Sequence, residues 1–197
     1  MRSYLFSAVS ALFLSLLAAG CTGFYSQVFH QDDPALFTPV APLYRMPLAP
    51  GHQQYLLAQG VGGRFTHTGD QTWAFDWTMP RSTPVPAARG GTVAAVRCVT
   101  TRDTRPFGER QGNEVRIRHA DGSIAVYAHI DSTVLRVGDA LAAGDTVALS
   151  GNTGNSTHPH LHFHVEKNGR SIPIAFVDCD DPYGIPRAGS LYRGSRP

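Results

Sequence analysis

Histidines gather at one point of the chain with a spacing of two residues. They alternate with apolar residues over the stretch His160-Leu161-His162-Phe163-His164-Val165. Such alternation predicts a half-buried β-strand, because successive side chains of a strand point to opposite faces. The three imidazoles would then share one face, about 6.6 Å apart along the strand. Neutral imidazole is the commonest metal ligand among side chains, so this face is a candidate zinc site, although a histidine-rich surface strand would show the same pattern.

The elements that must position these histidines are short strands separated by glycine and proline turns. Candidate strands span 92–99, 114–119, 123–130, part of 140–150, and 161–166. Asp121-Gly122 lies between the second and third of them, and this dipeptide is a strong hairpin signal, so we expect antiparallel pairing there. Helical periodicity is almost absent beyond residue 20, and 20 glycines and 14 prolines agree with a turn-dense chain. We therefore expect an all-β or mainly β domain.

The amino-terminal residues predict export. Arg2 precedes an apolar run over 4–19, which is shorter than the about 20 apolar residues of a membrane-spanning helix and is followed by small residues typical of signal cleavage. The stretch 17–21, Leu-Ala-Ala-Gly-Cys, resembles a bacterial lipobox with its leucine one position early. That resemblance implies a signal peptide over 1–20, lipidation of Cys21, and a place at the periplasmic face of the outer membrane. An ordinary signal with Cys21 left as a free thiol is the alternative.

The mature chain is long enough for one hydrophobic core. Removing 20 of 197 residues leaves 177, which favours a single domain over 51–197. Residues 21–50 are rich in proline without a period, which indicates an extended tether or a wrap along the domain. The net charge of +2 is too weak to indicate a nucleic-acid partner.

Two cysteines remain if Cys21 carries lipid. An even remainder in an exported protein favours a disulfide, here between Cys98 and Cys179. Such a bond would tie the tail of the chain to a strand near its middle.

Five motifs in a fixed order resemble the lysostaphin-type (M23, LytM-domain) zinc metallopeptidases. They occupy 76–85 (DWTMPRSTPV), 87–93 (AARGGTV), 127–130 (YAHI), 151–154 (GNTG) and 159–163 (PHLHF). The resemblance covers about 59–176 and implies a compact antiparallel β-sheet groove of the LytM, or duplicated hybrid motif, type that holds one zinc ion. Turn repeats at 137–139 and 143–145 also resemble those of lipoyl and biotinyl carriers. A carrier would need a modified lysine at the tip of a hairpin, and the only lysine near a candidate turn is Lys167.

The resemblance implies that His67, Asp76 and His162 bind the zinc ion. Two imidazoles and one carboxylate leave a fourth tetrahedral position for water, as a catalytic zinc site requires. Most relatives place the first histidine and the aspartate four residues apart, whereas this chain has Asp70 three residues after His67 and Asp76 nine after it.

We favour Asp76 over Asp70 as the ligand. Asp76 precedes the family-like run 79–85 in the correct frame and lies in the alternating segment 73–77, which is typical of a strand. Asp70 follows a glycine and has the sequence context of a turn residue.

The resemblance assigns His129 and His160 to water activation and to stabilising the charged tetrahedral intermediate. The chain has no His-Glu-x-x-His motif to supply a glutamate base, so histidine has to handle the proton. Alternation puts Tyr127 and His129 on one face of their strand, from which we expect His129 to face the same groove as His160. His160 and His162 could also chelate one ion together, so the division into catalyst and ligand depends on the resemblance.

Other residues near the motifs are weaker candidates. Asn155 and His158 border the expected site as candidate substrate-binding residues, although Asx and Ser/Thr turns explain the polar loop 152–157 equally well. His158 and His164 replace the residues usual in relatives, and they either tune the orientation of a zinc ligand or are simply tolerated. Three further histidines have no partner motif and are expected on the surface or in packing: His30, His52 and His119.

The function implied by the resemblance is a lipid-anchored zinc metalloendopeptidase that hydrolyses stem-peptide or bridge bonds of bacterial peptidoglycan by metal-activated water. A non-catalytic LytM-type regulator of cell-wall amidases is the first alternative. The five retained motif positions, and the absence of heptads and internal repeats, argue against it. A metallopeptidase that acts on an envelope protein is the second alternative. Some relatives plug their own groove, so residues 22–51 are also a candidate prosegment.

Overall fold

A computed structural model describes residues 32–99 and 105–195 of the chain. Its elements are η1 (Pro34–Leu36), β1 (Pro42–Tyr44), β2 (Tyr55–Gln59), η2 (Gly69–Gln71), β3 (Phe75–Thr78), β4 (Pro84–Pro86), β5 (Gly91–Arg97), β6 (Glu114–Arg118), β7 (Ile124–Ala128), β8 (Ala140–Leu141), β9 (Thr146–Leu149), β10 (His160–Lys167), β11 (Arg170–Ser171), β12 (Ala175–Phe176) and β13 (Leu191–Tyr192). The described residues form no α-helix, which confirms the all-β prediction. None of their helices has the length and apolar character needed to cross a membrane. The predicted signal peptide and Cys21 lie outside the described residues.

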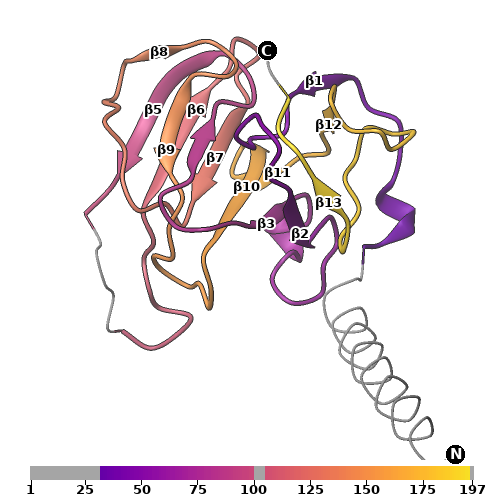
Figure 1. The fold of residues 1–197 in the computed structure, drawn as a ribbon, viewed down its shortest axis with the longest axis horizontal. Coiled ribbons are helices and arrows are strands. Elements are labelled where there is room, and N and C mark those ends of the chain that lie inside the picture. The colour runs from indigo at the N-terminus through magenta and orange to yellow at the C-terminus, as the bar shows by residue number, and fades with distance from the viewer. Residues whose placement is uncertain (1–31, 100–104, 196–197) are drawn as a thin grey trace, which may run out of the picture.

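One antiparallel sheet of nine strands carries most of the structure. Its order is β13-β2-β3-β10-β7-β6-β5-β8, with β11 paired to β10. Figure 1 shows β5, β6, β7 and β10 side by side. The predicted hairpin is confirmed, since β6 and β7 pair antiparallel through a turn in which Gly122 has a φ of 79°, a conformation that glycine adopts freely. Strand β10 lies near the middle of this sheet, between β3 and β7.

The two faces of β10 differ as the alternation predicts. Leu161, Phe163 and Val165 are fully buried on one face, and Phe163 packs there against Tyr127, with ring centroids 5.0 Å apart. Each such side chain contributes about 1.5–3 kcal/mol of stability by leaving water. Aromatic residues of two other strands complete this core: Phe75, Trp77 and Phe176. The opposite face of β10 is left for the histidines.

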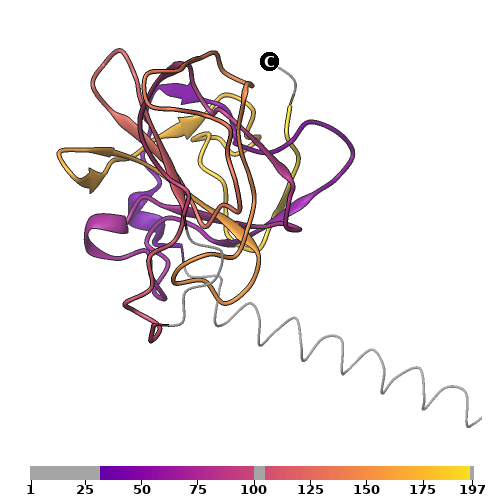
Figure 2. The same cartoon turned by 90° about the vertical axis from the view of Figure 1, so that its left-hand side faces the viewer.

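Residues 32–50 belong to the domain, so the boundary predicted at residue 51 lies too late. Tyr44, Met46 and Leu48 are buried in the main core, which makes this segment a wrap along the domain and not a tether. Strand β1 pairs in parallel with β12, and Figure 2 shows the purple arrow of β1 next to the yellow-orange arrow of β12. The backbone N–H of Met46 also donates to Asp178 Oδ1 at 2.9 Å. The sequence did not show this strand because it is only three residues long.

The predicted disulfide is not formed. Cys98 and Cys179 are both free thiols with different neighbours. Cys98 follows β5, and its Sγ donates to the carbonyl oxygen of Asp131 at 3.6 Å. Cys179 follows β12, packs against the apolar core, and lines a hollow with Pro39 and Tyr183. The even number of cysteines did not predict a bond between Cys98 and Cys179, because the two thiols have different surroundings in the fold.

Candidate active site

The register of the main sheet places one row of side chains across five strands. Gln59 on β2 is opposite Asp76 on β3, and Asp76 is opposite His162 on β10. His162 is in turn opposite Ala128 on β7, and Ala128 is opposite Glu114 on β6. Directly opposed residues of antiparallel strands share a face, so the whole row projects into one groove of about 350 Å³.

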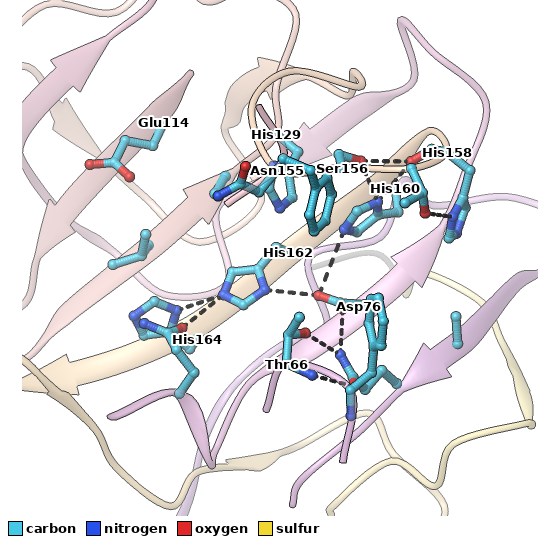
Figure 3. Close-up of a pocket in the computed structure, with 18 of the residues that line it drawn as sticks. Thr66, Asp76, Glu114, His129, Asn155, Ser156, His158, His160, His162 and His164 are labelled. Carbon is cyan, nitrogen blue, oxygen red and sulfur yellow. Dashed lines mark hydrogen bonds and ion pairs between the residues drawn. The ribbon is translucent and has the colours of Figure 1, made fainter. Parts of the chain in front are cut away.

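The three predicted metal ligands meet at this row. One donor atom each of His67, Asp76 and His162 lies within 4.8 Å of the others. Asp76 Oδ1 is 2.8 Å from His162 Nδ1, and Asp76 Oδ2 is 3.1 Å from His67 Nε2. Figure 3 shows Asp76 and His162 pointing toward one another from neighbouring strands. Asp70 stays outside, because its side chain is 65% exposed and forms an ion pair with Arg170 at 3.3 Å.

The surroundings of His67 fit a metal ion. Its ring is fully buried, and Nδ1–H donates to the carbonyl oxygen of Gly60 at 2.8 Å, so the lone pair is on Nε2. Nε2 is buried and makes no hydrogen bond, although it lies 3.1 Å from the Asp76 carboxylate. A lone pair and a carboxylate oxygen that face each other need a shared cation, either a proton or a metal ion. Two imidazoles and one carboxylate form a typical catalytic zinc donor set.

The charges of the cluster are set by opposing effects. Burial acts to raise the pKa of Asp76, but attraction to His67 and His162 outweighs it and leaves this pKa well below the usual value. Burial acts to lower the pKa of His67, and the Asp76 carboxylate more than compensates, so that pKa is raised. For His162, burial outweighs Asp76 and lowers the pKa. The carboxylate is therefore ionised and attracts a cation to its side of the groove.

Gln59 is a site residue that the sequence analysis did not identify. Its Nε2–H donates to Asp76 Oδ2 at 3.0 Å, and its Oε1 accepts the backbone N–H groups of Phe65 and Thr66 at 3.1 Å each. The register shifts by one residue between Leu57 and Gln59, which turns Gln59 out of the core and into the groove. A bulge of this kind leaves no signal in the alternation of the sequence.

His129 reaches the groove by a route that the alternation did not predict. Tyr127 is fully buried in the core, whereas Val126 and Ala128 line the groove, so continued alternation would have sent His129 into the core. The parity argument was therefore wrong. Strand β7 ends at Ala128, and His129 has a φ of 64°, which turns its ring toward the groove. A non-glycine residue rarely adopts this conformation, and such strain is typical of functional sites.

His129 and His160 present two imidazoles beside the ligands, with ring centroids 4.6 Å apart. His129 Nδ1–H donates to the carbonyl oxygen of Thr153 at 2.7 Å, and His160 Nδ1–H donates to that of His158 at 2.8 Å. Each ring therefore keeps its lone pair on Nε2. Burial, helped by His160 and His162, lowers the pKa of His129 to about 3, so this ring is neutral and able to accept a proton. His160 Nε2 is 3.9 Å from Asp76 Oδ1.

The predicted substrate-binding residues Asn155 and His158 both line the groove. Asn155 Oδ1 accepts backbone N–H groups of Gly108 and Arg110 at 2.8 and 3.2 Å, so it holds the loop before β6. His158 is exposed, and its Nε2 lies 3.4 Å from the hydroxyl of Thr78. Contact of either residue with substrate stays a prediction.

Two exposed phenyl rings also line the groove. Phe65 is 65% exposed and Phe107 is 50% exposed. They come from the loop after β2 and the loop before β6, respectively. None of residues 32–50 lines the groove, so this part of the candidate prosegment does not plug it. Residues 22–31 lie outside the described part of the chain.

A β-sheet groove with a His-Asp-His donor set beside two further imidazoles defines a metallopeptidase-like protein. The family model of Peptidase family M23 matches residues 70–173, and the chain belongs to this family. The matched stretch includes Asp76 and His162 but begins after His67, so the role of His67 depends on the geometry described above.

Similar proteins agree with this membership. The chain is 35% identical over 116 residues to a DD-carboxypeptidase/endopeptidase Mpg of Neisseria meningitidis serogroup B, covering 59% of this chain and 24% of the relative. It is 33% identical over 112 residues to a peptidoglycan DD-endopeptidase ShyA of Vibrio cholerae serotype O1, covering 57% of this chain and 24% of the relative. The chain thus spans about a quarter of the length of these curated relatives. A crystal structure of a putative peptidase M23 from Pseudomonas aeruginosa shares the fold, with a TM-score of 0.50 and 22% identity over 81% of this chain and 57% of that one.

Proposed function

We propose that this protein is a zinc metalloendopeptidase that hydrolyses peptide cross-links of bacterial peptidoglycan. The observation that carries the proposal is the meeting of His67, Asp76 and His162 within 4.8 Å at the floor of an open groove. The names of the Neisseria and Vibrio relatives support peptidoglycan peptides as the substrate class.

The chain's own residues supply the proton chemistry. A zinc ion held by the three ligands would act as a Lewis acid and would acidify a water molecule. His129 is kept neutral by burial and offers Nε2 to accept the proton of the attacking water. The same nitrogen then returns the proton to the leaving amine. His160 lies beside it, with ring centroids 4.6 Å apart, and would help to orient the attacking water through its own Nε2 lone pair.

The groove suits a thin, extended peptide. Its floor includes Val126 and Ala128, whose small side chains leave room above the sheet, and its lining includes the exposed rings of Phe65 and Phe107. These rings offer apolar contact to methyl groups of short side chains such as alanine. The position of Asn155 behind the loop that carries Phe107 keeps this part of the lining in place.

The place of action in this proposal is the bacterial envelope. The lipobox-like stretch 17–21 supports export and attachment through lipid on Cys21. A lipid anchor would hold the enzyme at the periplasmic face of the outer membrane, within reach of the wall. Metabolic labelling with a clickable fatty acid, compared between wild type and Cys21→Ser, tests the attachment, and equal labelling of both would contradict it.

Digestion of purified sacculi and of soluble cross-linked muropeptides tests the activity. We expect wild type and the matched control Asp70→Asn to release new amine ends and convert dimers to monomers, and His162→Ala to release none. No release by any of the three, together with stimulation of a wall amidase, would instead identify a regulator. Cleavage of an envelope protein, with no cleavage of peptidoglycan, would show that the substrate is a protein and not the cell wall.

A further inference from the structure

We infer that Gln71 is a positioning residue that holds the ring of the proposed metal ligand His162 and favours its tautomer with the hydrogen on Nε2. This inference deepens the proposed zinc site and rests on it. The Gln71 side chain lines the groove from the turn η2, and no motif of the sequence pointed to it.

The two nitrogens of His162 face different partners. Nδ1 lies 2.8 Å from Asp76 Oδ1, on the side where His67 is also found, so Nδ1 is the nitrogen available to a metal ion. Nε2 lies on the other side of the ring, 3.1 Å from Gln71 Oε1. An amide oxygen can only accept, so this contact requires a hydrogen on Nε2. Asp76 Oδ1 is also an acceptor, so without a cation the two oxygens compete for the single hydrogen of the neutral ring, whereas a metal ion on Nδ1 would leave that hydrogen on Nε2 for Gln71.

A second neighbour of His162 Nε2 is the ring of His164, which does not by itself determine which nitrogen of His162 carries the hydrogen. His164 Nδ1 is also 3.1 Å from His162 Nε2, and Figure 3 marks the contact with a dashed line. An imidazole nitrogen can donate or accept according to its tautomer. If His164 donated, the hydrogen of His162 would move to Nδ1 and would block the metal side of the ring. Because Gln71 Oε1 is an acceptor in every state, it opposes this arrangement and favours the hydrogen on Nε2 against the attraction of Asp76 Oδ1 for it.

The turn that carries Gln71 is held in a fixed position. The Thr72 hydroxyl donates to the carbonyl oxygen of Gly69 at 2.7 Å, which closes the turn. The next backbone N–H, that of Trp73, donates to Ser171 Oγ at 3.0 Å. Ser171 lies on β11, which pairs with β10, so the turn is fastened to the hairpin that carries His162. The segment between the proposed ligands His67 and Asp76 therefore places a hydrogen-bond acceptor, Gln71 Oε1, beside the third proposed ligand, His162. Outer contacts of this kind typically change metal affinity by about 10–100-fold.

Three variants of the full-length protein test the inference. Gln71→Leu keeps the size and removes the acceptor, Gln71→Glu keeps an acceptor, and Asp70→Asn is a matched control in the same turn. Competition with a chromophoric chelator measures zinc affinity. We expect about tenfold weaker binding for Gln71→Leu, and affinity no weaker than wild type for the other two. Gln71→Ala serves as the second acceptor-free variant if Gln71→Leu does not fold.

The tautomer gives a readout that does not need zinc or activity. Long-range ¹H–¹⁵N spectra of the metal-free protein should show a larger share of His162 with its hydrogen on Nε2 in wild type and in Gln71→Glu than in Gln71→Leu, where Asp76 Oδ1 remains as the acceptor and draws the hydrogen to Nδ1. Equal zinc affinity and equal tautomers in wild type and Gln71→Leu would overturn the role of Gln71. Failure of wild type to bind zinc would overturn the proposed function instead, and the spectra would still decide whether Gln71 sets the ring.

Discussion

Asp76 and His162 are directly paired residues of β3 and β10, and their side chains approach to 2.8 Å between Oδ1 and Nδ1. Their separation is therefore set by the register of two hydrogen-bonded strands in the middle of a sheet. The third predicted ligand, His67, comes from a loop but is fixed by its hydrogen bond to Gly60. Sites built on strands hold their geometry more closely than sites built on loops alone.

Replacing Asp76 by asparagine should remove zinc binding, whereas the same change at Asp70 should not. The side-chain amide of the Asp76→Asn variant would lack the charge that attracts the cation, so we expect zinc affinity to fall by at least about a hundredfold. Asp70→Asn only breaks an exposed ion pair with Arg170, and such pairs contribute little. Metal analysis after dialysis measures both variants. Loss of zinc from Asp70→Asn with retention in Asp76→Asn would reverse the ligand assignment.

Replacing His129 should separate catalysis from metal binding. We expect His129→Ala to retain zinc and to lose about 10²–10⁴-fold in kcat, because a proton acceptor is removed. His129→Gly should be equally inactive but more stable than His129→Ala by about 1 kcal/mol, since glycine tolerates the φ of 64°. Muropeptide kinetics and urea unfolding provide the measurements. A His129→Ala protein that is as stable as His129→Gly would show that the backbone is not strained there.

Replacing Phe107 by alanine should weaken substrate binding alone. The ring is half exposed in the groove, so its removal should leave the melting temperature and zinc content unchanged. Loss of its apolar contact should raise KM by about three- to tenfold, with kcat little changed. Val134→Ala is a suitable control, because Val134 is 93% exposed and does not line the groove. Equal KM values for the two variants would exclude Phe107 from the binding surface.

His119 should make stability depend on pH. This buried ring packs on Tyr44, and burial lowers its pKa although a hydrogen bond to Gly90 opposes the effect. The unfolded chain, with a histidine pKa near 6.5, therefore binds more protons on acidification, and stability falls as pH decreases. The stability from neutral His119 is complete above about pH 6.5 and is lost as pH falls toward the folded pKa.

His119→Gln removes this titration while an amide can still donate to Gly90. We expect the stability advantage of wild type over His119→Gln to be constant above the unfolded histidine pKa of about 6.5 and to shrink as pH falls below it. Urea unfolding at several pH values measures the difference. Parallel curves for the two proteins over this range would contradict the prediction.

Cys179 should react slowly with alkylating reagents. Burial raises its pKa to about 11, so only about one molecule in a thousand carries the thiolate at pH 8. Peptide mapping after iodoacetamide treatment without reductant should show Cys98 labelled first in the native protein, and both labelled fully in urea. Absence of label from both in urea would reinstate the disulfide.

The sequence predicts those parts of the fold that have a regular pattern. The alternation over 160–166 indicated the central strand with its correct faces, and the turn at Asp121-Gly122 indicated a hairpin. Strands of two or three residues, such as β1 and β12, have no room for a pattern and form because distant segments meet. The wrap by residues 32–50 is likewise a property of the assembled core.

The site was predictable in its residue types and less so in its geometry. The motifs indicated His67, Asp76 and His162, and the structure brings the three side chains together. His129 was expected in the groove for the wrong reason, because a positive φ, and not alternation, turns it there. Gln59 enters through a bulge, and bulges and isolated backbone angles are set by tertiary packing that no local pattern records.

The row of side chains from Gln59 to Glu114 depends on the register in which the five strands pair. A slip of β10 by a single position would turn His160, His162 and His164 into the core and would present Leu161 and Phe163 to the groove instead. The donor atoms of Asp76 and His162 would thus not meet in a sheet with the shifted register. In the proposed function, a chain with β10 out of register would therefore lack activity, because the carboxylate of Asp76 and the imidazole of His162 would no longer share a face.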